Sequence, residues 1–335
     1  MSQLQAAMRR LEERFVAWAQ TRPDIRAAII AGSWARVDHP ADEWSDLDIV
    51  VIAKHPERYL ARTDWLQDIG NPWLTFLEPT ATGGETERRV LFEGGIDVDF
   101  AVIANSKAKQ AARFLPVLRR LPILFRLLPK GVTRQIMQDV ASGAHVFARG
   151  TRVIVDKDGL ARKLPLVLSE NQPCRPPPQP EFLEVVNDFL YHTVWTAKKL
   201  LRGELWVAKS SCDTHMKRSL LRMIEWHARA TKGWDHDTWE GGRFLEEWAD
   251  PRAVEGLRQA FAHYNREDIQ RALFATMDLF RWLAVETGER LGYPYPTAAD
   301  GRVTEWIGGC LPEGTAAPRP GSSEHKTRTD SEVEP

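Results

Sequence analysis

Two pairs of aspartates, each with one residue between its members, are the side chains in this sequence best suited to chemistry. Asp46 and Asp48 open the apolar stretch DLDIVVIA, and Asp97 and Asp99 lie in IDVDFAVI. Side chains alternate between the two faces of a strand, so the carboxylates of each pair point the same way, with Cα atoms about 7 Å apart. Carboxylates gathered in a dry site need a cation, and Mg²⁺ prefers carboxylate and phosphate oxygens. The pattern therefore predicts a metal site that handles phosphate.

A glycine and a serine precede the first pair, at the end of another predicted strand. Residues 26–31 read RAAIIA and run into Gly32 and Ser33, and residues 34–45 separate these from Asp46. Gly32 has no Cβ and lets the backbone approach a phosphate, and Ser33 adds a hydroxyl, together with amide donors if it begins a helix. Two metal ions about 3.5–4 Å apart can hold the attacking and leaving oxygens of a phosphoryl displacement. The combination predicts phosphoryl transfer.

The surrounding hydrophobic pattern predicts an α/β region that positions these residues. Over residues 3–20 the apolar side chains recur every three to four positions, which is typical of an amphipathic helix. Gly94 and Gly95 are expected to form a turn between two strands, and helices are expected over 107–148. Five stretches rich in apolar and β-branched residues are predicted strands: 26–31, 46–53, 90–92, 96–103 and 153–155.

A proline-rich connector separates this region from a helical one. Residues 171–180 read NQPCRPPPQP, and their five prolines exclude a continuous helix or a central strand. From residue 181 to about 291 the apolar residues keep a helical spacing. The sequence therefore predicts an N-terminal domain over 1–170, a helical domain over 181–311 and a disordered tail over 312–335.

Composition and charge exclude several classes of protein. The 335 residues carry 45 Lys and Arg against 46 Asp and Glu, so no overall positive field attracts nucleic acid or an acidic membrane. The three cysteines are widely spaced without a CxxC pair, which excludes a disulfide scaffold and indicates a reducing compartment. The N-terminus has no apolar signal-peptide core, and no stretch is long enough to span a membrane. We expect a cytoplasmic monomer that binds neither nucleic acid nor membranes.

The segment GSWARVDHPADEWSDLDIVV, residues 32–51, resembles the signature of the nucleotidyltransferase superfamily, whose small-molecule members adenylylate antibiotics. Further segments resemble one branch of it, the aminoglycoside 6-adenylyltransferases or streptomycin adenylyltransferases. The resemblance covers about residues 25–300 and implies an α/β (α+β) nucleotidyltransferase-type domain with a mixed sheet, followed by an all-helical bundle. The segments are LFEGGIDVDFAVI (91–103), VIVDKDG (153–159), VNDFLYHTVWTAKKLLRGELWVAK (186–209), LLRMIEWHA (220–228), EGGRFLEEW (240–248) and YPYP (293–296).

The resemblance also implies roles for individual residues of the phosphate and metal site. Gly32 and Ser33 match the family's phosphate loop, and Asp46 and Asp48 match its two metal-binding aspartates. For the third carboxylate, an alignment without gaps selects Asp99, which we prefer, whereas a two-residue gap would select Asp97. The implied cofactors are two Mg²⁺ ions, with ATP as co-substrate.

Two further positions concern the nucleotide. Lys198, in WTAKKLL, matches a lysine of the family's helical domain that reaches the triphosphate, and Lys209 is a weaker second choice. The family has arginine directly after GS, whereas this chain has Trp34 there and Arg36 two residues later. Either Arg36 takes over the phosphate contact or the nucleotide site differs.

The resemblance implies transfer of AMP from ATP to a hydroxyl of an aminoglycoside, with the streptomycin 6-hydroxyl as acceptor and antibiotic resistance as the result. Asp99 would then complete a metal site or accept the hydroxyl proton. A cationic acceptor needs acidic and aromatic contacts, for which Glu78, Glu93 and Asp188 are candidates.

Two alternatives remain open at this stage. The family's aromatic pair in the first C-terminal helix appears here as Leu190 and Tyr191, so the same chemistry on another small molecule or on a protein side chain is one alternative. A nucleotide sensor without catalysis is the other.

Overall fold

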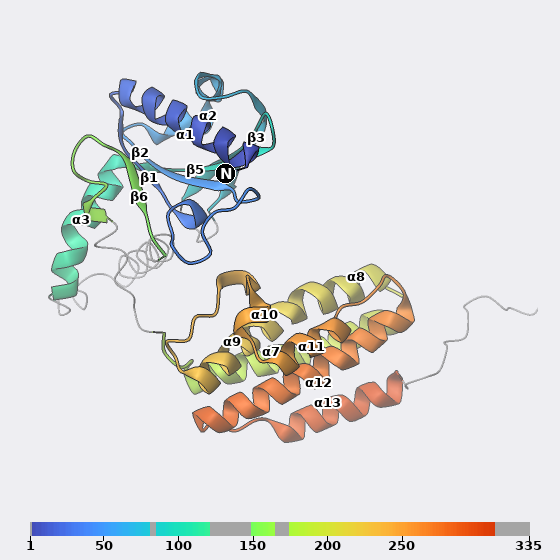
Figure 1. Ribbon diagram of the computed structural model, residues 1–335. Coiled ribbons are helices and arrows are strands. Elements are labelled where there is room, and N and C mark those ends of the chain that lie inside the picture. The colour runs from blue at the N-terminus through green and yellow to red at the C-terminus, as the bar shows by residue number, and fades with distance from the viewer. Residues whose placement is uncertain (1, 81–84, 121–148, 165–173, 312–335) are drawn as a thin grey trace, which may run out of the picture. The chain divides into compact units, whose positions relative to one another are not determined.

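The strands around the aspartates form one six-stranded sheet in the order β3-β4-β5-β2-β1-β6 (Figure 1). β2 and β5 pair in parallel and all other neighbours are antiparallel, so the sheet is mixed, as expected. This computed structural model describes residues 2–80, 85–120, 149–164 and 174–311. The strands are β1 (Ile25–Ile30), β2 (Leu47–Ala53), β3 (Pro72–Pro79), β4 (Thr86–Phe92), β5 (Ile96–Ala104) and β6 (Arg152–Asp156).

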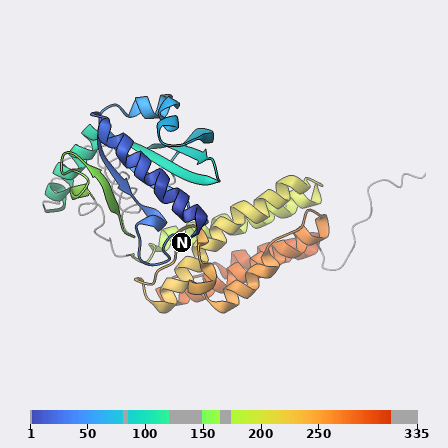
Figure 2. The ribbon, with the colours of Figure 1, turned by 45° about the horizontal axis from the view of Figure 1, so that its top comes forward.

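Helices cover both faces of the sheet, which explains why its central strands are apolar on both sides. The predicted N-terminal helix is α1 (Gln3–Thr21), and its apolar stripe packs on the face that carries Ala28 and Ile49 (Figures 1 and 2). On the opposite face, Ala108 of α3 (Asn105–Arg120) packs with Ile29 and Val50. A short helix, α2 (Pro56–Ala61), follows β2.

One strand has no counterpart in the sequence-based prediction. β3 lies at the edge of the sheet and pairs only with β4 among the described strands. A proline stands at each end, and exposed apolar side chains such as Trp73 and Phe76 break the alternation that marks a half-buried strand. The hydrophobic pattern of residues 72–79 therefore did not predict a strand.

The chain divides into two compact units at residues 172 and 173, and the second unit is helical. Its core contains the stacked rings of Phe189 and Phe280, whose centroids are 3.7 Å apart. Within the described residues, no helix combines the length and the apolar character needed to cross a bilayer. The helices are α7 (Gln179–Leu201), α8 (Leu205–Ser210), α9 (Met216–Lys232), α10 (Leu245–Trp248), α11 (Pro251–Ala260), α12 (Arg266–Leu291) and α13 (Thr297–Cys310).

The first helix of this unit begins inside the segment expected to be an extended connector. α7 starts at Gln179, with Pro180 in its first turn. Proline is tolerated there because the amides of the first turn have no partner within the helix. The helices expected over 121–148 and the tail expected over 312–335 lie outside the described residues.

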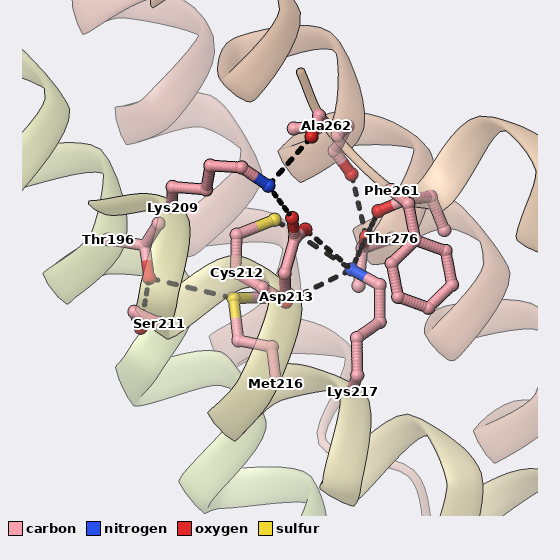
Figure 3. Close-up of polar contacts among 12 residues, drawn as sticks. Thr196, Lys209, Ser211, Cys212, Asp213, Met216, Lys217, Phe261, Ala262 and Thr276 are labelled. Atoms are coloured by element: carbon pink, nitrogen blue, oxygen red, sulfur yellow. Dashed lines mark hydrogen bonds and ion pairs between the residues drawn. The ribbon is translucent and has the colours of Figure 1, made fainter. Parts of the chain in front are cut away.

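A π-helical turn, Ser211–His215, joins α8 to α9 and surrounds a buried lysine (Figure 3). The Nζ of Lys217 donates to the carbonyl of Cys212 at 3.0 Å and to Oγ1 of Thr276 at 2.8 Å. Burial lowers the pKa of Lys217, because a charged ammonium loses its hydration there. The turn therefore supplies carbonyl and carboxylate oxygens that compensate a buried cation.

Asp213 connects this lysine to a second one. Its carboxylate accepts a hydrogen bond from Lys209 and lies 3.9 Å from Nζ of Lys217, while Lys209 also donates to the carbonyl of Ala262 at 2.7 Å (Figure 3). We expect Asp213→Ala to lower the free energy of unfolding by about 2–4 kcal/mol, because it leaves two partly buried cations without their carboxylate. Urea unfolding followed by circular dichroism measures the loss.

The matched control is Glu255→Ala on α11. Glu255 pairs with Arg258 at 3.2 Å, and both side chains are about 70 % exposed. Breaking such a surface pair should cost about 0–1 kcal/mol. Equal losses in the two variants would contradict a stabilising role for Asp213.

Candidate metal and phosphate site

Three of the predicted aspartates meet at one end of the parallel strand pair. Each of Asp46, Asp48 and Asp99 offers a carboxylate oxygen, and these oxygens all lie within 4.8 Å of one another. Asp48 on β2 is directly opposite Asp99 on β5 in the parallel register, and Asp46 immediately precedes β2. Asp97 is not in this group of described residues. The geometry therefore matches the ungapped alignment.

The third carboxylate has one oxygen that is engaged and one that is not. Asp99 is 5 % exposed, and its Oδ2 accepts hydrogen bonds from Arg89, from Nε at 3.0 Å and from Nη2 at 2.5 Å. Its Oδ1 is buried and has no hydrogen-bond partner among the described residues. A buried carboxylate oxygen without a partner is costly. Together with the two neighbouring carboxylates, it makes a donor set that fits a hard divalent cation.

The electrostatics of Asp99 follow from this environment. Burial raises the pKa of Asp99, because it disfavours the charged form, while the hydrogen bonds and charge of Arg89 lower it. On the neighbouring strand, burial and the charge of Asp99 raise the pKa of Glu87 to about 7. Acidic groups are therefore crowded at this end of the sheet, and a cation would relieve their repulsion.

Gly32 is the residue that makes room for Asp48. Gly32 to Trp34 form a single 3-10 turn after β1, and Gly32 has a φ of +65°. A Cβ at this position would lie 2.2 Å from Oδ2 of Asp48. The amide of Ala31 donates to the carbonyl of Asp48 at 3.1 Å, which fixes the turn against β2. No other residue type can occupy this position without moving the carboxylate.

The neighbouring serine also has an unused polar atom. The Oγ of Ser33 is buried and has no hydrogen-bond partner among the residues described. The turn is only three residues long, so Ser33 does not begin an α-helix and the extra contribution of a helix N-terminus is absent here. What remains is a hydroxyl one residue after Gly32, whose backbone lies against the Asp48 carboxylate, and such a hydroxyl can donate to an anionic oxygen.

The departure at Trp34 has a packing explanation. Trp34 packs against the core beneath α1, and Arg36 donates from Nε to the carbonyl of His39 at 2.7 Å. Trp34 is the last residue of the turn, and Arg36 lies in the segment that leads from the turn to Asp46. A phosphate contact by Arg36 remains a prediction.

The two lysines predicted for the nucleotide lie in the helical unit. Lys198 is exposed on α7, and its Nζ lies 5.6 Å from the centroid of the Trp306 ring. Lys209 is held by Asp213 and by the Ala262 carbonyl. Lys209 therefore has a structural role, whereas the side chain of Lys198 is accessible, and its contact with the triphosphate remains a prediction.

A second polar cluster has no simple signal in the sequence. Asp188 and His192 on α7 meet His215 of the π-helical turn, with ligand atoms within 4.8 Å of one another. His215 Nε2 lies 3.0 Å from Asp188 Oδ2, and His192 Nδ1 lies 3.2 Å from Asp188 Oδ1. Sequence spacing could not show this group, because residues 192 and 215 belong to different elements. Arg89 was missed for a similar reason, since its partner is on another strand.

Comparisons with known proteins identify a family that the chain resembles along most of its length. The family model described as "Streptomycin adenylyltransferase" matches residues 7–309. An aminoglycoside 6-adenylyltransferase of Bacillus subtilis (strain 168) is 22% identical over 304 residues, covering 88% of this chain and 94% of the relative. One from Campylobacter jejuni is 21% identical over 290 residues, covering 87% of this chain and 91% of the relative.

Among solved structures, the crystal structure of an aminoglycoside 6-adenyltransferase from Bacillus subtilis covers 92% of this chain and 99% of its own, at 19% identity and a TM-score of 0.40. The family model alone spans nearly all of the described residues, from α1 to α13. The chain belongs to the streptomycin adenylyltransferase family and is an enzyme of the nucleotidyltransferase type.

Proposed function

We propose that this enzyme transfers AMP from ATP to a hydroxyl of an aminoglycoside in a Mg²⁺-dependent reaction, with the 6-hydroxyl of streptomycin as the first acceptor to test. Such a reaction would confer antibiotic resistance and would take place in the cytoplasm, where ATP is available. The observation that carries the proposal is the cluster of Asp46, Asp48 and Asp99 beside Gly32. The relatives that bear the name aminoglycoside 6-adenylyltransferase support the choice of acceptor.

The polar groups of the cluster suit a nucleoside triphosphate. Asp46, Asp48 and Asp99 would hold two Mg²⁺ ions, which, when bound, neutralise the triphosphate and increase the electrophilicity of the α-phosphorus. Ser33 would donate its hydroxyl to a phosphate oxygen, and the bare backbone at Gly32 lets that phosphate come close. Arg36 and Lys198 are the additional cations that we assign to the phosphates.

The residues of the chain would hold the acceptor hydroxyl and ATP in line for a single displacement at the α-phosphorus. The acceptor oxygen forms a bond to the α-phosphorus, and the bond between that phosphorus and the bridging oxygen to the β-phosphate breaks. Pyrophosphate leaves with that electron pair, and the hydroxyl proton passes to Asp99 or to water. Asp99 takes the proton only where its Oδ1 does not bind the metal; with Oδ1 on the metal, water takes it. Positioning and electrostatic stabilisation account for the catalysis.

We assign the cationic acceptor to the side of a cavity in the helical unit that α7 forms, because the side formed by α9 carries two arginines, Arg218 and Arg222. The cavity has a volume of about 1070 Å³. This is close to the upper end of the range for small-molecule sites, which is about 300–1000 Å³. One face of α7 contributes Glu181, Glu184, Asp188 and Tyr191 to its lining. These positions are three or four residues apart and therefore share a side of the helix. Carboxylates and an exposed aromatic ring are the groups that recognise ammonium and guanidinium.

The other acidic candidates are already engaged. Glu78 lies 2.9 Å from Arg89, and Glu93 accepts a hydrogen bond from Asn71 at 3.2 Å. We retain Asp188 for the acceptor because it lines the cavity, although it also contacts His192 and His215. Tyr191 is the aromatic contact that we assign beside it. Leu190, the other member of the expected aromatic pair, is buried in the helical core.

The proposal is tested by incubating the protein with ATP, Mg²⁺ and streptomycin and measuring pyrophosphate release and the mass of the drug. We expect the drug to gain one AMP, and we expect Asp48→Asn to lower the rate by about 10³-fold or more, because a metal ligand is lost. Circular dichroism checks that the variant is folded. Mg²⁺-dependent ATP binding without product would point to another acceptor, and full activity in Asp48→Asn would contradict the metal assignment.

Gly32→Ala tests the phosphate loop separately. The added methyl must displace the Asp48 carboxylate, so we expect the rate to fall by about 10²-fold or more. Gly95→Ala is the matched control, because Gly95 also has a positive φ, +76°, yet a Cβ there meets no atom within 4 Å. Both variants should lose about 1 kcal/mol of stability from the strained backbone. If their activities fall equally, backbone strain and not the carboxylate is responsible.

Asp188→Asn tests the acceptor cavity. We expect the KM for streptomycin to rise about tenfold, because the drug loses an ionic contact, while the KM for ATP stays within about twofold. The control is Asp278→Asn on α12, which removes an exposed carboxylate paired with Arg281 at 2.8 Å. A change in the KM for ATP alone would place Asp188 outside the acceptor site.

A further inference from the structure

Arg89 is a basic residue at the metal cluster that no part of the proposed reaction yet uses. It lies on β4 directly opposite Asp99 on β5. Its Nε and Nη2 donate to the same oxygen of Asp99, Oδ2, at 3.0 and 2.5 Å. The other oxygen, Oδ1, has no hydrogen-bond partner within the described part of the chain. One oxygen of the carboxylate is thus fixed by the protein and the other is left for a ligand.

Two glutamates hold Arg89 in this position. The Nε of Arg89 lies 2.9 Å from Oε1 of Glu78 and 3.7 Å from Oε1 of Glu87. Glu78 on β3 is directly opposite Glu87 on β4 in the antiparallel register. The guanidinium is therefore tied to three adjacent strands, and its rotamer is restrained by contacts on either side. Arginine suits this role because its donors have a fixed planar geometry.

Arg89 has two opposite effects on a cation bound at this site: its positive charge repels the cation, and its hydrogen bonds orient the carboxylate of Asp99 that binds it. Like charges a few ångströms apart repel each other in a partly buried site, so an isolated guanidinium would weaken the binding of a divalent ion. Here Glu78, with Glu87 nearby, offsets that charge. With its charge offset, Arg89 acts on the site mainly through its two hydrogen bonds to Oδ2 of Asp99.

We propose that Arg89 is a positioning residue for the cation site: it holds Oδ2 of Asp99, so that Oδ1 faces Asp46 and Asp48 and is reserved for the metal. The inference rests on the proposed function, since it assumes that these carboxylates bind a divalent ion. Residues that orient a ligand from behind typically change metal affinity or activity by about 10–100-fold when they are replaced.

The experiment measures Mn²⁺ binding directly, with the full-length protein and without nucleotide or acceptor. Free Mn²⁺ is quantified by electron paramagnetic resonance across a titration. We expect Arg89→Met to raise the Kd for Mn²⁺ by about tenfold or more, and Arg89→Lys to recover part of the loss, because one ammonium can still bind Oδ2 but cannot also hold Glu78 in the same geometry. An unchanged or lower Kd in Arg89→Met overturns the proposal.

The matched control removes another arginine that binds an aspartate through two nitrogens. Arg62 donates to Asp64 from Nε at 3.1 Å and from Nη2 at 2.7 Å, in an exposed loop. Arg62→Met should leave the Kd for Mn²⁺ unchanged. A rise equal to that in Arg89→Met would mean that the loss of any surface cation produces the effect, and it would overturn the specific role of Arg89.

Asp48→Asn separates this inference from the proposed function. If Asp48→Asn weakens Mn²⁺ binding and Arg89→Met does not, the metal site stands and the role of Arg89 is wrong. If Asp48→Asn also leaves binding unchanged, the metal site itself is wrong. Thermal unfolding confirms that each variant is folded. If Arg89→Met does not fold, Arg89→Lys decides: a Kd for Mn²⁺ above that of the unsubstituted protein supports the proposal, and an unchanged Kd overturns it.

In turnover assays we expect Arg89→Met to need more Mg²⁺ for half-maximal activity, while excess Mg²⁺ restores most of kcat. Damage confined to packing would lower kcat at every Mg²⁺ concentration and would contradict a role in cation binding.

Discussion

Three carboxylates whose oxygens lie within 4.8 Å of one another repel each other strongly, and the sheet has to keep them together against that repulsion. At such separations each pair of charges interacts by several kcal/mol in a partly buried site. The backbone can hold the carboxylates in place because the hydrogen bonds of two paired strands fix the register of Asp48 and Asp99. A cation, when present, converts the repulsion into attraction.

The rigidity of that strand pair comes from apolar packing. β2 is buried along nearly its whole length, and it lies between β5 and β1 with a hydrophobic cluster on each face. A shift in register by one residue would turn Ile49 and Val50 to the wrong faces. The hydrophobic core therefore determines where Asp48 points, although Asp48 itself is only half-buried.

Much of this arrangement could be predicted from the sequence, and what could not has a physical reason. The apolar content of β1, β2 and β5 and the aspartates at their ends follow from local patterns. Asp97 and Asp99 point to the same face of β5, and the preference for Asp99 came from the ungapped alignment with the family. The parallel register places Asp99 directly opposite Asp48, which periodicity alone does not show. Arg89 and His215 act through partners on other elements, so periodicity carries no information about them. β3 was missed because its exposed faces leave no alternation.

The parallel pairing of β2 with β5 also affects how the chain folds during synthesis. Between Asp48 and Asp99 the chain must first make β3 and β4, which lie on the far side of β5. At a ribosomal rate of about 5–20 residues per second, the interval lasts about 3–10 s. During that time one edge of the apolar β2 has no partner strand, and such edges associate readily with other chains. The strand that brings the third carboxylate is thus also the one that covers the open edge of β2.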